Sequence, residues 1–585
     1  MPPADRTSVQ HASGQLCVAL AMFFVFFLVT LNLASAQGFQ QLQADEQPTS
    51  IKGTVLNSIT HAPIARALVF SPDNRLAALT DGEGNFSFSL PKPDSNGVLV
   101  FNGSPSGLMA RKPGFLNDPN DHRQTETSGS ELTITIPLMP EALIKGRAVS
   151  PDSDPTPGIT VQLYSRQVQD GMPRWVQMGS TRANYNGEFR FAELLPGNYK
   201  LMSNESMDND PAITVPGGQQ FGFPPVYYPG VADFASAGTI QLTAGQTVQV
   251  DLPLTRQPYY PVRIPVTSPQ PNAFNITVSV QGHRGPSYSL GYNEQNQRIE
   301  GLLPKGNYLV EAEFYGQNSV SGSAHLAVAG APAEGSILNP IPNSSIAVHV
   351  TEEFTSTTLE ESSATFSRDG GNSFSVHGPR AYLQINAEPA DDFERQGAWL
   401  RPPTGPSDEA IVLDNLRPGR YWLRLHSSRG YVASASMGGV DVLHQPLVVS
   451  PGSSTSIEVT VRDDMAELEG KVAGITPPTV GNSTMFQGIQ QLVREARHTP
   501  AWVYCIPLPD SSGQFQQLPV SPDGTIDTSQ MVPGAYRVMA FADQQPNLPY
   551  RDAVAMRAYE SKGQVVHLPA GQKTSVQLQL IPSIE

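Results

Sequence analysis

The stretch Leu194–Tyr199, with the sequence LLPGNY, recurs in related form three times further along the chain. The other copies are LPKGNY at Leu303–Tyr308, LRPGRY at Leu416–Tyr421 and MVPGAY at Met531–Tyr536. Aligned on the tyrosine, a glycine always lies two residues earlier and a Leu or Met five residues earlier. The tyrosines are 109, 113 and 115 residues apart, which is close to the length of one small domain. This spacing predicts an array of similar domains.

The residues after these copies alternate between two kinds of side chain, with the period of a β-strand. After the third copy, Tyr421, Leu423 and Leu425 alternate with Trp422, Arg424 and His426. This alternation predicts a strand with one buried face. We expect the tyrosine ring to be buried and its hydroxyl group to bond to nearby backbone, as in the tyrosine corner of sandwich domains. The Pro-Gly pair predicts a β-turn in which the glycine supplies a positive φ.

The composition agrees with an all-β array and excludes some classes of partner. The chain has 585 residues with 53 Pro and 50 Gly, which suits many strands joined by tight turns. Length alone suggests about four domains, whereas the repeats suggest about five. The net charge of −16 argues against nucleic acid or an anionic membrane surface as a partner.

The N-terminus has the pattern of an export signal. Arg6 precedes an apolar run at residues 16–31, and Ala34-Ser35-Ala36 supplies small residues for cleavage before Gln37. The alternative is an uncleaved membrane anchor, although the run is short for a bilayer. We expect a signal peptide at 1–36, a flexible tether at 37–49 and no membrane span after cleavage. The expected location is secreted, periplasmic or at the cell surface.

Further recurring patterns divide the rest of the chain into five expected sandwich domains. Their predicted ranges are 50–140, 141–256, 257–350, 351–463 and 464–585. Similar opening strands stand at Ile51–Val55, Ile144–Ala148 and Leu468–Val472, and similar closing strands at Leu132–Leu138, Val248–Leu254, Ile457–Val461 and Val576–Leu580. Residues 346–350 are expected to form a strand at the end of the third domain. A helical period at residues 486–496 predicts a short helical insertion in the fifth.

The first two domains resemble the carboxypeptidase regulatory-like domain. The matching segments are Ile51–Val55, the Asp-x-x-Gly-x-Phe-x-Phe hairpin at Asp81–Phe88, Lys112–Phe115, Ile144–Gly146, Asn186–Phe189 and the corner at Leu194–Tyr199. The first domain departs from the pattern because Pro91–Gly97 replaces its corner. The resemblance implies a transthyretin-like or immunoglobulin-like β-sandwich of a secreted or cell-surface protein. In this family the domain is an accessory or structural module beside a carboxypeptidase domain, and no such catalytic domain is visible here.

The sequence carries no motif that predicts catalysis. The histidines stand singly, without the spacing of a zinc site, and no nucleophile elbow, phosphate-binding loop or dinucleotide fingerprint occurs. Asp81, Glu83 and Asn85 offer alternating oxygen ligands and are weak candidates for Ca²⁺, with a plain hairpin turn as the alternative. Cys505, the one cysteine after the export signal, is expected to be a buried structural thiol. We therefore expect no catalytic residues, no cofactor and no enzyme activity.

A dense aromatic set is the candidate ligand-binding site. Its members are Phe221, Phe223, Tyr227, Tyr228 and Phe234. Exposed rings in a stiff loop could stack on sugars, and the alternative is that they cover a seam between domains. The leading hypothesis is a non-enzymatic surface protein with a structural or adhesion role, whose partner is a polysaccharide or a cell-surface protein. A carbohydrate- or peptide-binding protein using residues 221–234 comes second, and a hydrolase with an inter-domain site third.

Overall fold

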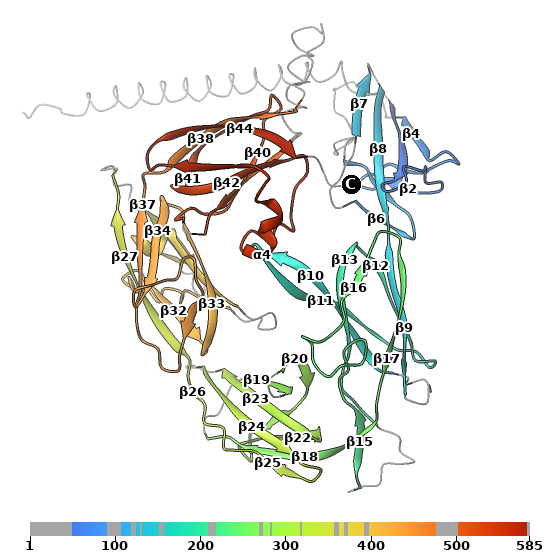
Figure 1. Cartoon of the computed structure of the whole chain (residues 1–585), viewed down its shortest axis with the longest axis vertical. Coiled ribbons are helices and arrows are strands. Elements are labelled where there is room, and N and C mark those ends of the chain that lie inside the picture. Colours follow the sequence, from blue (N-terminus) through green and yellow to red (C-terminus); the bar gives the residue numbers. More distant parts are fainter. Residues whose placement is uncertain are drawn as a thin grey trace, which may run out of the picture. The chain divides into compact units, whose positions relative to one another are not determined.

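The expected all-β, multi-domain fold class is confirmed by the computed structural model (Figure 1). The structure describes residues 50–89, 107–118, 124–128, 131–150, 156, 158–208, 218–267, 273–280, 283–315, 319–355, 362–367, 373–390, 397–475, 501–509 and 511–581. The expected signal peptide and tether, residues 91–97 and the helical insertion lie outside these ranges. Among the described residues, no helix combines the length and the apolar character needed to cross a membrane.

The chain divides into two compact units. The first contains the first sandwich and comprises residues 1–143, 192–196 and 243–247, and the second comprises the remainder. In the first sandwich one sheet has β4 (Asn85–Ser89), β1 (Ser50–Asn57), β8 (Glu131–Pro140) and β6 (Phe115–Asn117), with β7 (Gln124–Ser128) also paired to β8. The other sheet has β3 (Ala77–Leu79), β2 (Leu68–Phe70) and β5 (Met109–Arg111). The core between them includes Ile51, Val55, Phe86 and Ile134.

The second unit contains two further sandwiches in its first half. The second sandwich has β12 (Glu188–Leu194), β9 (Ala142–Val149) and β17 (Thr247–Pro253) in one sheet, and β11 (Met172–Arg182), β10 (Thr160–Gln169), β13 (Gly197–Ser203) and β16 (Ile240–Leu242) in the other. The third has β14 (Ser206–Met207), β15 (Gln220–Phe223), β18 (Gln257–Pro265), β22 (Arg298–Pro304), β21 (Gly291–Asn293) and β25 (Ala333–Glu334) in one sheet. Its other sheet has β20 (His283–Tyr288), β19 (Ala273–Val280), β23 (Gly306–Tyr315), β24 (Val320–Val328) and β26 (Ile341–Pro342).

The second half of this unit contains the fourth and fifth sandwiches. The fourth has β32 (Val412–Leu416), β27 (Ser344–Glu353), β37 (Ile457–Arg462), β34 (Tyr431–Met437) and β35 (Val440–Asp441) opposite β31 (Ala398–Trp399), β30 (Leu383–Pro389), β33 (Gly419–Ser427) and β36 (Leu447–Val449). A hairpin of β28 (Ser363–Ser367) and β29 (Ser373–His377) precedes the short helix α2 (Pro379–Tyr382). The fifth has β40 (Gln516–Pro519), β39 (Trp502–Pro507), β42 (Gly534–Phe541), β44 (Lys573–Ile581), β38 (Ala466–Ala473), β41 (Thr525–Met531) and β43 (Gln564–Leu568), with α4 (Ala553–Met556) and η2 (Arg557–Tyr559).

A glycine in the opening strand lets three strands meet closely. In the first sandwich β1 pairs in parallel with β8 and antiparallel with β4, where Gly53 lies opposite Phe86. A Cβ atom on Gly53 would lie 2.1 Å from the Ile134 carbonyl oxygen and 2.5 Å from Cζ of Phe86. The ring therefore covers the space that a side chain would take. The equivalent Gly146 and Gly470 are also crowded by a closing-strand carbonyl, at 1.5 and 2.7 Å from such an atom.

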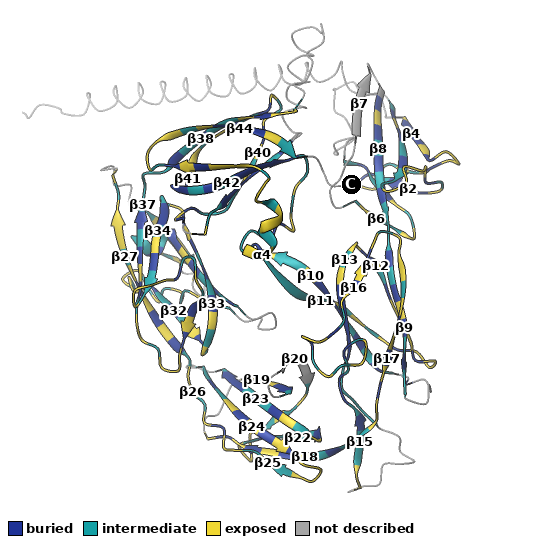
Figure 2. Cartoon of the chain, in the orientation of Figure 1, coloured by how far each residue is buried: buried dark blue, intermediate teal, exposed yellow. Residues whose placement is uncertain are grey.

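The corner tyrosines are buried, as predicted (Figure 2). The strand β33 alternates between buried and more exposed residues, as expected. In β13 all residues from Tyr199 to Ser203 are buried, and in β42 the alternation stops after Val538, so the predicted alternation is wrong there. Three of their hydroxyl groups donate to the carbonyl oxygen four residues earlier: Tyr308 to Pro304 at 2.8 Å, Tyr421 to Arg417 at 3.1 Å and Tyr536 to Val532 at 2.6 Å. Tyr199 is 3% exposed, and its hydroxyl group interacts with Ser165. At these three corners the tyrosine therefore buries its ring in the core and also donates a hydrogen bond to a backbone carbonyl group.

The predicted positive φ of the corner glycine is found at two of the four corners. Gly197 and Gly534 have φ of 158° and 159°, whereas Gly306 and Gly419 are not among the glycines with positive φ. Lack of space for a side chain is a further reason at two of the corners. A Cβ atom on Gly306 would lie 2.8 Å from the Tyr308 hydroxyl oxygen, and one on Gly534 would lie 2.5 Å from Oγ of Ser511.

The structure also corrects one strand assignment. Residues 346–350, expected to end the third domain, belong to β27, which pairs antiparallel with β32 and in parallel with β37. They therefore form the opening strand of the fourth sandwich. Alternation identified the strand, but it cannot identify the partner, because every half-buried strand has the same period.

We predict that Gly53→Ala destabilises the first sandwich by about 1–3 kcal/mol or more, because the added methyl group overlaps a backbone carbonyl. Differential scanning calorimetry and limited proteolysis of the full chain would measure the loss. Gly82→Ala in the same sandwich is the matched control, since its Cβ atom would meet nothing within 4 Å. Equal stability of the two variants would contradict the packing role assigned to Gly53.

We predict that Tyr536→Phe lowers the stability of the fifth sandwich by about 1–3 kcal/mol. The change leaves the Val532 carbonyl without its donor and the Gln514 N–H, now 3.0 Å from the tyrosine hydroxyl, without its acceptor. Calorimetry should show one transition moving down by a few degrees. Tyr185→Phe serves as the control, because Tyr185 is 93% exposed. A transition that does not move would show that this hydroxyl group contributes nothing to stability.

Candidate ligand-binding site

The outer face of the sheet formed by β31, β30, β33 and β36 presents aromatic and polar side chains. On β33, Tyr421, Leu423 and Leu425 are buried, whereas Trp422, Arg424 and His426 point away from the core. Their cross-strand partners on β30 are Glu388, Asn386 and Gln384 respectively. Because directly opposite side chains lie within contact distance, this arrangement sets a tryptophan, a guanidinium group and two amides side by side.

A second tryptophan extends this face. Trp399 on β31 lies opposite Asn386 and is 63% exposed, so its ring is available to a ligand. Asn386 thus has Arg424 on one side and Trp399 on the other. A flat ring next to hydrogen-bonding groups can bind a partner that has both an apolar face and polar edges.

The corresponding faces of two other sandwiches are covered by the chain itself. In the second, Tyr227, Phe234 and Ala237 pack with Tyr164 and Met202 in a small separate core. In the fifth, Met539 and Phe541 pack with Leu548, and Tyr550, Met556 and Tyr559 lie against this cluster. Because such a cover turns an outer face into a second core, neither face offers an open platform.

A hairpin of the second sandwich borders the face of the fourth. The tip joining β10 and β11 is Asp170-Gly171, whose φ values of 46° and 73° make a tight turn. The Gly171 carbonyl accepts a hydrogen bond of 3.0 Å from the backbone N–H of Arg551. A Cβ atom on Gly171 would lie 2.6 Å from the Tyr550 ring, so only glycine permits this approach. Arg174 of the hairpin donates to the Pro389 carbonyl at 2.9 Å.

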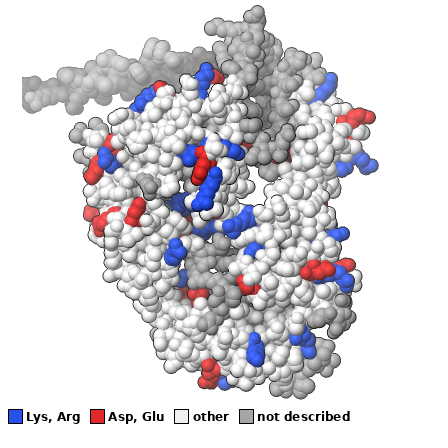
Figure 3. All heavy atoms as spheres, viewed as in Figure 1, with Lys and Arg blue, Asp and Glu red and all other residues white. Residues whose placement is uncertain are grey.

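The fifth sandwich provides the remaining wall. The rings of Phe515 and Tyr550 stack at 3.8 Å with an interplanar angle of 2°. Together these surfaces enclose a cavity of ≈ 1180 Å³, which we call the Arg-Trp cleft. Its lining residues include Asp170, Arg380, Trp399, Arg401, Trp422, Arg424, His444, Phe515, Tyr550, Arg551 and Glu560. Lys and Arg side chains gather around a hollow on the face of the molecule shown in Figure 3.

The cleft contains crowded cationic groups. Burial lowers the pKa of Arg380, Asp408 opposes this, and the nearby Arg401 lowers the pKa further. Burial and the neighbouring Arg551 likewise lower the pKa of Arg424. Since an arginine keeps its proton in proteins even so, these groups remain cations that repel one another. A bound anion would relieve that repulsion.

Two carboxylates of the protein already contact Arg424. Its Nη2 atom lies 2.5 Å from Oε2 of Glu388, and it also forms an ion pair with Asp170 at the hairpin tip. Burial raises the pKa of Glu388, whereas Arg174 and Arg551 lower it. The geometry at Arg424 is therefore suited to carboxylate groups.

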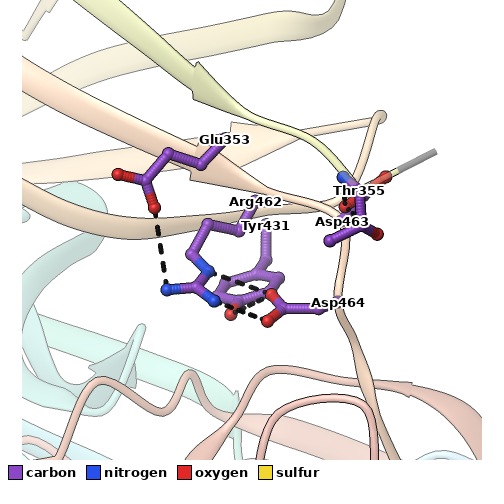
Figure 4. A network of polar contacts seen from close by, with 6 residues as sticks. All are labelled: Glu353, Thr355, Tyr431, Arg462, Asp463 and Asp464. Carbon is purple, nitrogen blue, oxygen red and sulfur yellow. Dashed lines mark hydrogen bonds and ion pairs between the residues drawn. The ribbon is translucent and has the colours of Figure 1, made fainter. Parts of the chain in front are cut away.

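A polar network fixes the connection between the fourth and fifth sandwiches (Figure 4). Arg462 at the end of β37 donates to both carboxylate oxygens of Asp464, at 3.0 and 2.6 Å, and lies 3.7 Å from Glu353. The Tyr431 hydroxyl group donates to Asp464 at 2.9 Å, and Asp463 accepts from Thr355 at 2.7 Å. The bond from Arg462 lowers the pKa of Asp464, with burial opposing it. The short connection before β38 is therefore held at several points.

The predicted aromatic site does not form one exposed platform. Tyr227 and Phe234 are each 2% exposed, and the Lys200 ammonium group donates to the Phe234 carbonyl at 2.7 Å. Phe221 and Phe223 instead lie on β15 in the sheet of the third sandwich, with the Arg256 guanidinium group 4.2 Å from the Phe221 ring centre. Tyr228 is half-buried. The structure thus separates the five rings into two neighbourhoods, because the intervening chain changes sheets.

The weak calcium candidates have local structural roles. Oδ1 of Asp81 accepts from the backbone N–H groups of Glu83 and Asn85 at 3.0 and 2.7 Å, which closes the hairpin turn. Oδ1 of Asn85 accepts from the Thr54 hydroxyl group at 3.0 Å. Within the described ranges, no group of three His, Cys, Asp or Glu side chains is placed to hold a metal ion.

Cys505 is buried, as predicted. Burial raises the pKa of its thiol to about 12, so the thiolate is scarce at neutral pH. The residue belongs to the core of the fifth sandwich, with Val538 and Tyr536 in the same cluster.

Sequence reasoning identified Trp422, Arg424 and His426 as the outer residues of a strand but did not treat them as a site. The available signal was Trp422, because a large aromatic side chain on the solvent side of a half-buried strand is less common there than a polar one. Trp399, Arg380 and Arg401 lay outside any recognised pattern. Their convergence depends on how α2, β31 and β33 pack together.

Comparisons with known proteins leave the family open. No protein-family model and no curated protein matches the chain, so the resemblance to the carboxypeptidase regulatory-like domain is not confirmed. Similar regions occur in the Bacillus anthracis TIE protein, with 10% identity over 68% of this chain and 65% of that chain and a TM-score of 0.14. The streptococcal ancillary pilin has 11% identity over 49% and 98% of the two chains and a TM-score of 0.17. The shaft pilin spaA of Lactobacillus rhamnosus GG has 8% identity over 36% of this chain and 98% of that chain, and a TM-score of 0.18. These likenesses are too weak to support an argument about function.

We predict that Gly171→Ala loosens the β10–β11 hairpin from the cleft, because the new methyl group would overlap the Tyr550 ring. Hydrogen exchange should become faster at the Arg551 amide, which now donates to Gly171. Gly439→Ala is the matched control, since Gly439 also has a positive φ, of 83°, but no atom within 4 Å of its Cβ position. Both variants carry a backbone cost of about 1–2 kcal/mol. If both variants leave the hydrogen-exchange rate of the Arg551 amide unchanged, the close contact between Gly171 and Tyr550 does not hold the hairpin in place.

Proposed function

We propose that this protein is a non-enzymatic, secreted or cell-surface array of β-sandwich modules that binds carbohydrate in the Arg-Trp cleft. The observation that carries the proposal is the exposed Trp399 ring opposite Asn386, on the same outer sheet face as Trp422. A sugar ring has an apolar face that can stack on tryptophan and hydroxyl groups at its edges that bond to amides.

The shape of the cleft supports a binding role. Its walls come from the outer sheet face of the fourth sandwich, the β10–β11 hairpin and the segment around Tyr550. A concave site of this size with a few polar groups among aromatic ones is typical of ligand pockets. The remaining modules hold and space this site. The export pattern at residues 1–36 and the acidic composition are the basis for the proposed location.

Binding through the aromatic set at residues 221–234 is the second candidate. Phe221, Phe223 and Tyr228 are only half-buried and keep part of their surface available. This candidate is weaker because Tyr227 and Phe234 are committed to a small core. A role in adhesion to a cell-surface protein would use the same accessible faces.

We predict that Trp399→Ala and Trp422→Ala each weaken carbohydrate binding at least about tenfold, the usual effect of truncating an aromatic anchor. A glycan array followed by calorimetric titration of the best ligand would measure the change. Tyr185→Ala is the control, since this tyrosine is 93% exposed and does not line the cleft.

Three results would contradict the proposal in different ways. Absence of binding to any glycan would remove the carbohydrate assignment. Binding that survives both tryptophan changes but is lost in Tyr228→Ala would favour the second candidate. Shortening of the bound glycan, followed by product analysis, would show that the protein is an enzyme.

A further inference from the structure

We infer that the Arg-Trp cleft selects an acidic polysaccharide, one whose sugar rings carry carboxylate groups. The inference rests on the proposed carbohydrate-binding function and specifies its ligand class. It follows from the chemistry of the guanidinium groups around the two tryptophans.

Three guanidinium groups in the cleft have an N–H without an acceptor. The Nε atoms of Arg380, Arg401 and Arg424 are buried and have no hydrogen-bond partner within the described part of the chain. Arg380 is only 8% exposed, although its other nitrogens donate to the carbonyl oxygens of Ala410 and Arg401. A buried donor without an acceptor is unfavourable, and proteins rarely leave several in one place. Because the protein encloses these Nε atoms, a ligand carboxylate in the cleft would stabilise the three guanidinium groups by its charge.

The charge of the lining favours anions despite the acidity of the whole chain. Among the described residues, the charged side chains of the lining are six arginines and two carboxylates: Arg380, Arg401, Arg424, Arg537, Arg551 and Arg557, and Asp170 and Glu560. The chain as a whole has a net charge of −16. A concentration of arginines in one concave region therefore attracts anions locally while the remaining surface repels them.

A carboxylate is the anion that best fits this face. Arg424 already accommodates two carboxylates, from Glu388 and from Asp170 at the hairpin tip. Arginine recognises planar carboxylates through parallel hydrogen bonds.

The position of the tryptophans indicates that the carboxylates belong to sugar rings. Asn386 on β30 lies between Trp399 on β31 and Arg424 on β33, so a ring stacked on Trp399 lies two strands away from the guanidinium group. Arg380 donates from Nη2 to the backbone carbonyl oxygen of Arg401 at 2.6 Å, and both residues line the same cavity wall, where they offer a further cationic position. Several cations distributed around aromatic rings suit a chain with repeated acidic rings better than a single small anion.

The test is calorimetric titration of the full chain with four probes of matched length. These are oligogalacturonate, a neutral galactan oligosaccharide, sulfated dextran and poly-glutamate. We expect oligogalacturonate to bind at least about tenfold more tightly than the others. We also expect Arg401→Gln to weaken its binding at least about tenfold, because a charge-assisted hydrogen bond is lost.

Two further variants separate charge from structure. Arg401→Lys keeps the charge and should retain part of the affinity, while losing the bidentate geometry. Arg420→Gln is the matched control, because Arg420 lies exposed on β33 outside the cavity lining. Unchanged calorimetric unfolding would show that Arg401→Gln folds normally.

The outcomes distinguish this inference from the proposal on which it rests. Equal binding of the neutral galactan, with no effect of Arg401→Gln, would overturn the acidic assignment and leave carbohydrate binding intact. Equal binding of poly-glutamate or sulfated dextran would assign the cleft to polyanions in general and overturn the specificity for acidic sugars. Failure of both oligosaccharides to bind would count against the proposed function itself.

Discussion

The close pairing of an opening strand with a closing strand is the constraint on which the sandwiches depend. In the first, fourth and fifth sandwiches these two strands run in parallel although they come from opposite ends of the module. Gly53, Gly146 and Gly470 remove the side chain where a carbonyl oxygen approaches. In these three sandwiches the opening and closing strands can pair only after the two ends of the module have come together, so this long-range pairing completes the fold of the module.

In the second to fifth sandwiches, a corner tyrosine completes the core from the opposite sheet. In the last three of these, its hydroxyl group also donates to a carbonyl oxygen just before the strand. The inner face of each corner strand is therefore committed to the fold. The outer face is free to vary, and it is covered in the second and fifth sandwiches and lines a cavity in the fourth. Function is expected where copies of one fold differ.

Several features followed from the sequence because they are local. The four corners, the buried tyrosines, the alternation of Tyr421, Leu423 and Leu425, and the buried Cys505 all depend on short-range pattern and composition. Other features depend on distant partners. The pairing of β27 with β37, and the separation of Phe221 from Phe234, required knowledge of which sheet each segment joins.

The sequence by itself determined that this is an array of β-sandwiches and which face of each corner strand is buried, because strand period and turn chemistry act within a few residues. The tertiary structure decided which outer faces are covered and which line a cleft. It brought Arg380, Arg401 and Arg424 to the same cavity as Trp399, although no spacing in the chain relates them. The physical reason is that period 2 distinguishes the two faces of a strand, whereas packing alone decides what lies against each face.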